Sequence, residues 1–180
     1  MTHDKISIAP EAGTAIGLQC PRLRRPPLDP SALTATPWDD PHAKARMGDA
    51  ILSFIARGMP RSGFTKALYR RLSMMFGFIA CYNQQGFWGT HFGTTDARAA
   101  FLEQIVRWPC WGAPDATWCD VEREIATRIR AQGLVASYQQ AARRERTQQE
   151  REMLAHLLEK YGPEVSGPMQ SRSPEQMGLL

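Results

Sequence analysis

The sequence predicts a mainly α-helical protein with a single globular domain, and three observations support this fold class. Apolar residues recur at spacings of three and four along most of the chain. Many of these stretches begin with a capping residue or end at a glycine or proline. Signals for β-strands are short and weak. A mixed α/β fold is the alternative.

The 180 residues divide into three predicted parts. Residues 1–38 form an extended N-terminal arm, because residues 1–40 contain six prolines and no clear period, and each proline keeps its neighbour out of the α region. Residues 39–162 form the helical domain. Residues 163–180 lack an apolar period and are predicted to be a disordered tail. We expect the domain to fold without the arm.

Two helices are predicted in the first half of the domain. Asp39-Asp40-Pro41 favours a helix start, with an acid as the cap and proline as the first helical residue. This helix should end near Gly58. Ser62 is expected to cap a second helix that reaches Tyr82, with Gly77 in its interior.

One small β element and three more helices follow. Residues 87–92 are aromatic and glycine-rich, and we expect a short strand or an irregular packed segment there. Helices are predicted over 95–108, 117–133 and 135–161 from their caps, apolar faces and terminal glycines or proline. The last helix has a polar first half with charges of alternating sign.

The charge pattern predicts a basic patch. The chain has 22 lysine and arginine residues against 18 acids, and residues 41–95 contain seven basic residues and one acid. Such a local excess is typical of a surface that binds nucleic acid or an acidic partner. A solvated helix face is the alternative. The candidate binding residues are Arg61, Lys66, Arg70 and Arg71.

The candidates for catalysis are few. Asp120 and Glu124 are spaced to share one helix face, and two carboxylates there would hold a divalent cation, although helix starts commonly collect acids. His91 lies between glycines and is a candidate acid or base, but a packed structural histidine is the more common case. The catalytic residues stay unassigned, and no metal site is predicted.

Cysteine and tryptophan indicate structure more than chemistry. The four cysteines do not have zinc-site spacing and are expected to be reduced and buried. Trp108, Trp111 and Trp118 are predicted to cover a helix junction. Any exposed part of this tryptophan cluster would be a hot spot for protein binding.

The sequence favours a soluble, cytoplasmic protein without a membrane span. The longest strongly hydrophobic run without charge is about ten residues, from Leu72 to Cys81, and a spanning helix needs about 20. The first ten residues lack the basic start and long apolar stretch of a signal peptide.

Several blocks of the chain resemble small accessory proteins of broad-host-range conjugative plasmids. The first block is Phe76 to Trp88 (FGFIACYNQQGFW). It is followed by Phe101-Leu102, Pro109-Cys110-Trp111-Gly112 and Asp120-Val121-Glu122-Arg123. Across residues 68–135 the chain is similar to the Osa-type fertility-inhibition family.

This resemblance implies a host-cytoplasmic factor that blocks DNA transfer by a rival conjugation or type IV secretion system. It implies action at the coupling protein or relaxosome, and ATPase and DNase activity in a ParB/sulfiredoxin-like fold. ATP and a divalent cation would then be cofactors. The sequence departs from that fold because its glycine, arginine and strand signals are weak, and no catalytic residue carries over.

Three functional hypotheses follow. The first is an inhibitor that binds a component of the conjugation machinery, which exposed tryptophan and arginine at one patch would favour. The second is an ATP-dependent DNase, which carboxylates converging with His91 or an arginine would favour. The third is a DNA-binding regulator, which needs a polar recognition helix, whereas the helix over residues 64–82 is too apolar.

Overall fold

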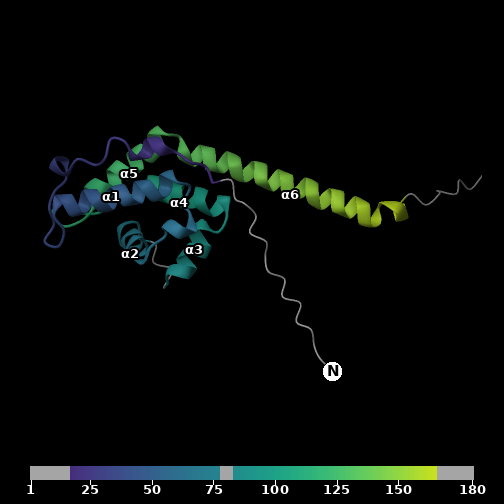
Figure 1. The fold of residues 1–180 in the computed structure, drawn as a ribbon, viewed down its shortest axis with the longest axis horizontal. Coiled ribbons are helices and arrows are strands. Elements are labelled where there is room, and N and C mark those ends of the chain that lie inside the picture. The colour runs from purple at the N-terminus through teal and green to yellow at the C-terminus, as the bar shows by residue number, and fades with distance from the viewer. Residues whose placement is uncertain (1–16, 78–82, 166–180) are drawn as a thin grey trace, which may run out of the picture. The chain divides into compact units, whose positions relative to one another are not determined.

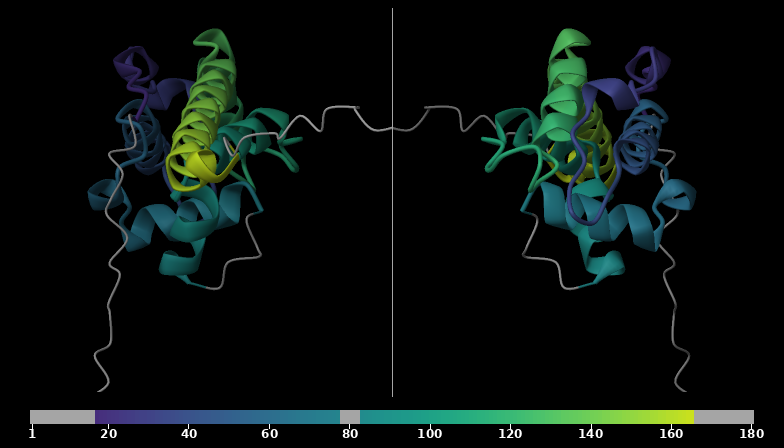
Figure 2. Two further views of the ribbon diagram at one scale, coloured as in Figure 1. Left: turned by 90° about the vertical axis from the view of Figure 1, so that its right-hand side faces the viewer. Right: turned by 90° about the vertical axis from the view of Figure 1, so that its left-hand side faces the viewer.

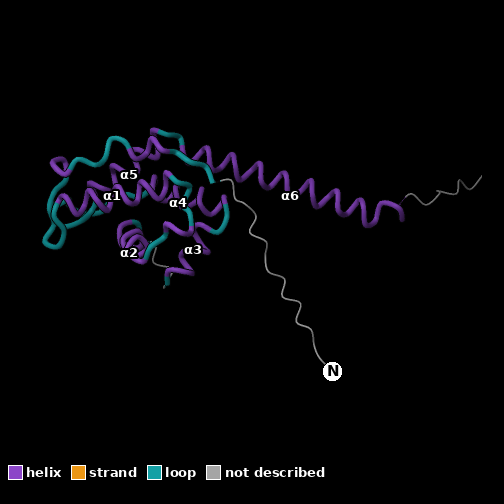
Figure 3. Tube along the Cα trace, viewed as in Figure 1, coloured by secondary structure: helices purple, strands orange, loops and turns teal. Residues whose placement is uncertain are grey.

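The computed structural model describes residues 17–77 and 83–165. Within these ranges the chain forms six α-helices and three short 3-10 helices, and no strand (Figures 1 and 3). The elements are η1 (Pro21–Arg24), η2 (Pro30–Ala32), α1 (Pro41–Ala56), η3 (Arg61–Gly63), α2 (Lys66–Met75), α3 (Gln84–Phe92), α4 (Thr95–Arg107), α5 (Cys119–Ala131) and α6 (Leu134–Val165). The mainly α fold class is confirmed, and the mixed α/β alternative has no support in the described residues.

The chain divides into two compact units, Met1–Ala142 and Arg143–Leu180. The first unit contains α1 to α5 and the first turns of α6. In it, α1 packs against η1, η2, α2 and α5, while α4 packs against α3 and α5. Figures 1 and 2 show α2 and α3 lying together on one side of α1 and α5.

The core of the first unit is apolar and rich in phenylalanine. Phe54, Phe64, Phe87, Phe92 and Phe101 are buried, and neighbouring rings among them have centroids 4.7–5.8 Å apart. Burial of each such ring stabilises the fold by about 1.5–3 kcal/mol relative to exposure. This cluster joins α1, α3 and α4 into one body.

The predicted β element at residues 87–92 is wrong, because these residues belong to helix α3. The side-chain oxygen of Asn83 accepts a hydrogen bond from the backbone N–H of Gly86 (2.7 Å) and caps the helix. Phe87 and Phe92 then fall on the buried face. Tertiary packing of this aromatic face outweighs the low helix propensity of the glycines.

The second predicted helix is shorter than expected. It begins at Lys66, capped by the side chain of Thr65 instead of Ser62, and it ends at Met75. Gly77 therefore lies after the helix, where its φ is +59°. Glycine adopts this left-handed conformation without a steric penalty. The predicted continuation through residues 78–82 lies outside the described residues.

The second half of the predicted arm contributes to the core. Leu23 of η1 and Leu28 are buried against α1, and the backbone N–H of Leu28 donates to Asp49 of α1 (3.0 Å). The prolines therefore prevent regular helix without keeping this segment out of the interior. The first half of the predicted arm, residues 1–16, lies outside the described residues.

The second unit begins within α6, at Arg143. Its described part is helical, as predicted for 135–161, and α6 continues to Val165, past the predicted helix end at residue 161. Exposed apolar side chains at positions 153, 154, 157 and 158 follow one stripe of this helix. Residues 166–180 lie outside the described residues. Among the described residues no helix combines the length and hydrophobicity needed to cross a membrane.

Candidate binding site: an aromatic pocket

The largest tryptophan cluster of the chain lines a surface pocket of about 450 Å³. Its walls come from the segment at residues 36–39, from α2, from the loop that joins α4 to α5, and from α5. Four tryptophans and two methionines make up half of the twelve lining residues: Trp38, Trp108, Trp111, Trp118, Met74 and Met75. A pocket of this volume with apolar walls and a few polar groups is typical of binding sites.

A buried lysine holds two of these walls together. Lys44 of α1 is completely buried, and its Nζ donates to the backbone oxygens of Thr34 (2.8 Å) and Thr117 (3.1 Å). The same ammonium pairs with the carboxylate of Asp120 at 2.7 Å. Asp120 also accepts a hydrogen bond from the backbone N–H of Thr34 (3.0 Å). The network ties the segment before α1 to the loop before α5.

Arg71 and Asp39 form the polar side of the pocket. The guanidinium carbon of Arg71 lies 3.8 Å from the centroid of the Trp118 ring. One Arg71 nitrogen donates to the two Asp39 oxygens at 3.5 and 3.4 Å. The indole N–H of Trp118 also donates to Asp39, at 3.0 Å. Trp118, buried with its N–H satisfied, is thus a fixed platform for the guanidinium.

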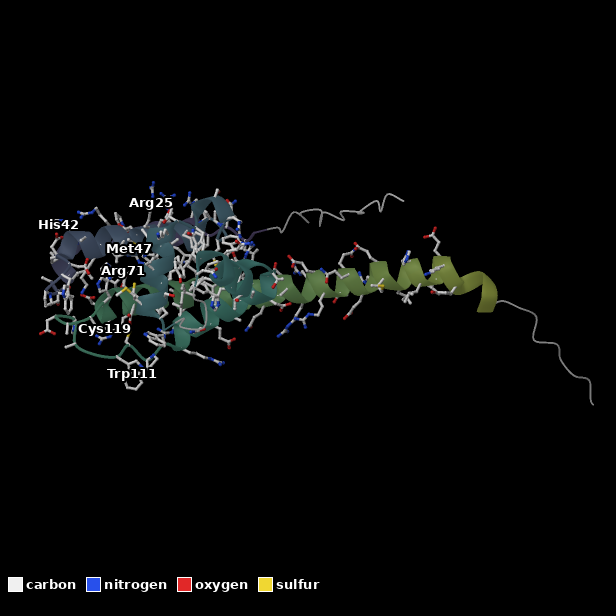
Figure 4. All side chains as sticks on the ribbon, turned by 90° about the horizontal axis from the view of Figure 1, so that it is seen from below. Arg25, His42, Met47, Arg71, Trp111 and Cys119 are labelled. Atoms are coloured by element: carbon white, nitrogen blue, oxygen red, sulfur yellow. The ribbon has the colours of Figure 1, made fainter. Side chains whose placement is uncertain are left out.

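Three large apolar side chains at the pocket are open to solvent. Trp38 is 79% exposed, Met74 is 74% exposed and Trp111 is 72% exposed. Figure 4 shows the labelled Trp111 side chain at the edge of the unit. Apolar surface gathered in this way marks interaction sites, and tryptophan and arginine are enriched among the residues that dominate binding energy.

Glu122 of α5 lies in the pocket wall and is only 6% exposed. Desolvation raises its pKa, and hydrogen bonds with Cys110 and Trp108 partly oppose this rise. Burial and the neighbouring Glu122 raise the pKa of Cys110 to about 11. The Cys110 thiol is therefore protonated at neutral pH and is a poor nucleophile.

The structure does not bring the predicted catalytic candidates together. Asp120 is paired with Lys44, and Glu124 is paired with Arg128 at 2.7 Å. His91 packs on Phe87, with ring centroids 4.5 Å apart, and burial lowers its pKa. Within residues 17–77 and 83–165, no group of three or more His, Cys, Asp or Glu side chains is arranged to hold a metal ion.

The four predicted basic residues are in different surroundings. Lys66 and Arg70 are exposed on α2. Arg61 lies over the ring of Trp88, with its guanidinium carbon 5.2 Å from the ring centroid. Arg71 instead belongs to the aromatic pocket. The charge pattern thus indicates one residue of the pocket, Arg71. It predicts Arg71 on an exposed basic patch, whereas in the structure Arg71 lies over the Trp118 ring and pairs with Asp39.

Sequence reasoning missed Trp38 and Asp39. The hot-spot hypothesis covers the three tryptophans of the loop at 108–118, and the structure adds Trp38 from a segment about 70 residues earlier. Trp38 falls in the predicted arm, because it has no apolar period around it. The one sequence feature that could have indicated Trp38 as a site residue is the presence of a tryptophan in such a polar, aperiodic stretch.

A second surface carries an arginine ridge, which we define as Arg22, Arg24 and Arg25. All three are exposed, and hollows of about 440 and 520 Å³ lie beside Arg24 and Arg25. Arg128 fixes the turn below them, because its Nη1 donates to the backbone oxygens of Leu23 (3.0 Å) and Pro26 (2.6 Å). In Figure 4, Arg25 and Trp111 lie at opposite edges of the unit.

Comparison of the chain with models of known protein families, with curated proteins and with solved structures finds no match.

Proposed function

We propose that this protein is a fertility-inhibition factor that docks through the aromatic pocket onto a protein component of a conjugation or type IV secretion system. The observation that supports docking is the exposure of Trp38 and Trp111 beside Arg71 at one pocket. Tryptophan and arginine gathered at one surface patch, here two exposed tryptophans and the partly exposed Arg71, are the feature that favours the inhibitor among the three hypotheses.

The target class comes from the sequence resemblance. The similarity to the Osa-type family extends over residues 68–135, which include the loop at 108–118 and most of the pocket wall. On this basis the coupling protein or the relaxosome is the proposed target, and inhibition follows from occupying a surface that these components need.

A hydrolytic function has less support. It would require acids to converge with a histidine or an arginine on a cleft, whereas Asp120 and Glu124 each form an ion pair with a separate cation. His91 packs among aromatic rings of α3 and α4. Binding therefore explains the described surface better than ATP-dependent DNA cleavage.

A mating assay tests the docking proposal. Trp38→Ala and Trp111→Ala together should abolish inhibition of plasmid transfer and capture of the purified coupling protein or relaxosome proteins. The matched control is Met153→Ala with Leu158→Ala, which also removes two exposed apolar side chains. Full inhibition by the tryptophan variant, with its fold intact by circular dichroism, would overturn the proposal.

Nucleic-acid binding is a second candidate, and the arginine ridge favours it. Three exposed guanidinium groups on a turn fixed by Arg128 suit phosphate contacts without base reading. The alternative surface for nucleic acid is the basic patch predicted from the sequence, of which Lys66 and Arg70 are exposed on α2.

Fluorescence anisotropy with a labelled random duplex separates these two surfaces. Arg24→Gln with Arg25→Gln should weaken binding and lower the salt slope by about two, one for each lost phosphate contact. Lys66→Gln with Arg70→Gln removes the same charge and should leave binding nearly unchanged. If the α2 variant has the larger effect, the ridge is not the contact surface.

A further inference from the structure

We propose that the aromatic pocket recognises a partner segment in which a large apolar side chain lies next to a carboxylate, with the carboxylate bound by Arg71. This inference rests on the proposed docking function and adds the chemistry of the segment that the pocket accepts.

Arg71 does not use all of its hydrogen-bond donors. Only its Nη2 nitrogen forms hydrogen bonds to described residues, both to Asp39 at 3.4–3.5 Å. Charge-assisted N–H···O bonds are usually about 2.7–2.9 Å long. The planar guanidinium carries five donors in a fork that matches a carboxylate. The Arg71 donors that Asp39 does not occupy thus stay available for a second, better-placed carboxylate.

Arg71 is already held in place. Its guanidinium lies on the ring of Trp118, and Trp118 is itself fixed by the hydrogen bond to Asp39. A stacked guanidinium keeps its N–H edge open, because stacking uses its face. A group held in this way loses little conformational freedom when it binds, and this preserves affinity.

The charges around the pocket favour a negatively charged ligand group. A ligand cation would have to compete with Arg71 for the Trp118 ring, and it would meet the positive charge of Arg71. Of the two acids in the lining, Asp39 already accepts bonds from Arg71 and Trp118, and Glu122 is buried with Cys110 and Trp108. The geometry therefore favours an anion at Arg71.

The apolar part of the segment has its own surface. Trp38, Trp111 and Met74 are exposed around a pocket of about 450 Å³. Their hydrophobic surface would be removed from water by an aromatic or large aliphatic side chain, which stabilises the complex by about 25 cal/mol per Å² buried. The carboxylate then fixes the orientation of that side chain.

A pair of small probes with opposite charge tests the inference. We would titrate the full chain with 3-phenylpropionate and, separately, with 3-phenylpropylamine at neutral pH, and follow the indole N–H resonances of the tryptophans by NMR. The carboxylate should bind more tightly than the amine. Arg71→Met should weaken carboxylate binding by about tenfold or more and should leave amine binding unchanged or stronger, because it removes the positive charge that opposes the amine.

Arg70→Met is the matched control, because Arg70 is an exposed neighbour on the same helix. It should leave the binding of both probes unchanged. If Arg71→Met fails to fold, Arg71→Lys replaces it, since lysine keeps the charge but loses the planar fork, and carboxylate binding should again weaken. Equal or tighter binding of the amine overturns the inference, as does failure of both probes to bind.

The failure of this inference is distinguishable from failure of the docking proposal. If the amine binds better while Trp38→Ala with Trp111→Ala abolishes transfer inhibition, docking stands and only the ligand chemistry is wrong. If the tryptophan variant inhibits normally, docking through the pocket is wrong, whichever probe binds.

Discussion

At the residue scale, Lys44 is the polar group on which the candidate site most depends. A buried ammonium is tolerated only when its charge is paired and its donors are satisfied. Lys44 meets both conditions through Asp120 and the backbone oxygens of Thr34, Pro114 and Thr117. The carboxylate considered as a cation ligand is therefore the counter-ion of a structural lysine.

We predict that Asp120→Asn destabilises the protein by about 3–5 kcal/mol, because it leaves the ammonium of Lys44 buried without a countercharge. Urea unfolding followed by circular dichroism measures the change. Glu103→Gln is the control, since its ion pair with the exposed Arg107 should be worth at most about 1 kcal/mol. Equal effects of the two variants would show that the Lys44 pair carries no special stability.

Glu122 predicts a pH dependence of stability. Desolvation raises its pKa above the ordinary value of 4.5. The titratable and charged groups near it are Cys110, Asp120 and Arg123, and Asp39 and Arg71 line the same pocket. A raised pKa means that the folded chain binds more protons than the unfolded chain. The contribution of Glu122 protonation to the free energy of unfolding is therefore complete below about pH 4.5. It is lost as the pH rises through the pKa of Glu122 in the folded chain.

Glu122→Gln removes this titration. The free energy of unfolding of the variant should increase relative to the natural chain as the pH rises above 4.5, and urea midpoints at several pH values measure the difference. A difference that is constant with pH, or that has the opposite slope, would contradict the assignment.

At the element scale, the end of α2 is set by Gly77. A Cβ atom at this position would lie 2.6 Å from the ring of Trp108, and the φ of +59° disfavours any residue with a side chain. Gly77→Ala should thus cost at least about 1–2 kcal/mol and displace a wall of the pocket.

Gly89→Ala is the matched comparison within α3. A Cβ atom added at Gly89 would have no neighbouring atom within 4 Å, and the backbone there is helical. This substitution should stabilise the protein by about 0.5–1 kcal/mol. Thermal unfolding of both variants tests the pair, and a stable Gly77→Ala protein would contradict the described turn.

A substitution in the segment before α1 tests whether that segment is part of the core. Leu23→Ala should cost about 2–5 kcal/mol, because the side chain is completely buried. Leu154→Ala makes the same chemical change on the exposed stripe of α6 and should cost less than about 1 kcal/mol. If Leu23→Ala is as mild, residues 17–38 would be a dispensable arm after all.

Local sequence signals are sufficient for α1, α4, α5 and most of α6, because each combines an apolar face with recognisable end signals. They fail for α3, whose glycines lower its helix propensity and whose stability comes from packing of Phe87 and Phe92. They also fail at Leu23, since one leucine in an aperiodic stretch gives no period to read. Burial of such residues is decided by tertiary contacts.

At the scale of the whole molecule, the division at Ala142 predicts where the chain can be shortened. Leu134, Tyr138 and Ala142 are buried residues of α6, and the Tyr138 hydroxyl donates to the backbone oxygen of Leu18 (3.0 Å). A chain ending at Ala142 should unfold cooperatively, with a midpoint within about 3 °C of the full chain.

A chain ending at Ala131 is the comparison, because it also removes Leu134 and Tyr138. Its loss of the large buried side chains of Leu134 and Tyr138 should lower stability by several kcal/mol. Differential scanning calorimetry distinguishes the two truncations. A large loss in the chain ending at Ala142 would show that the division into units does not separate independent parts.

The pocket walls come from segments that are distant in sequence, as shown by the hydrogen bond between Trp118 and Asp39 across 79 positions. A site of this kind has high contact order, so it forms only after long-range contacts close during folding. A peptide copied from residues 108–118 would lack Trp38, Asp39 and Arg71. It should neither bind a partner of the full protein nor compete with it, so an effective mimic has to reproduce the assembled surface.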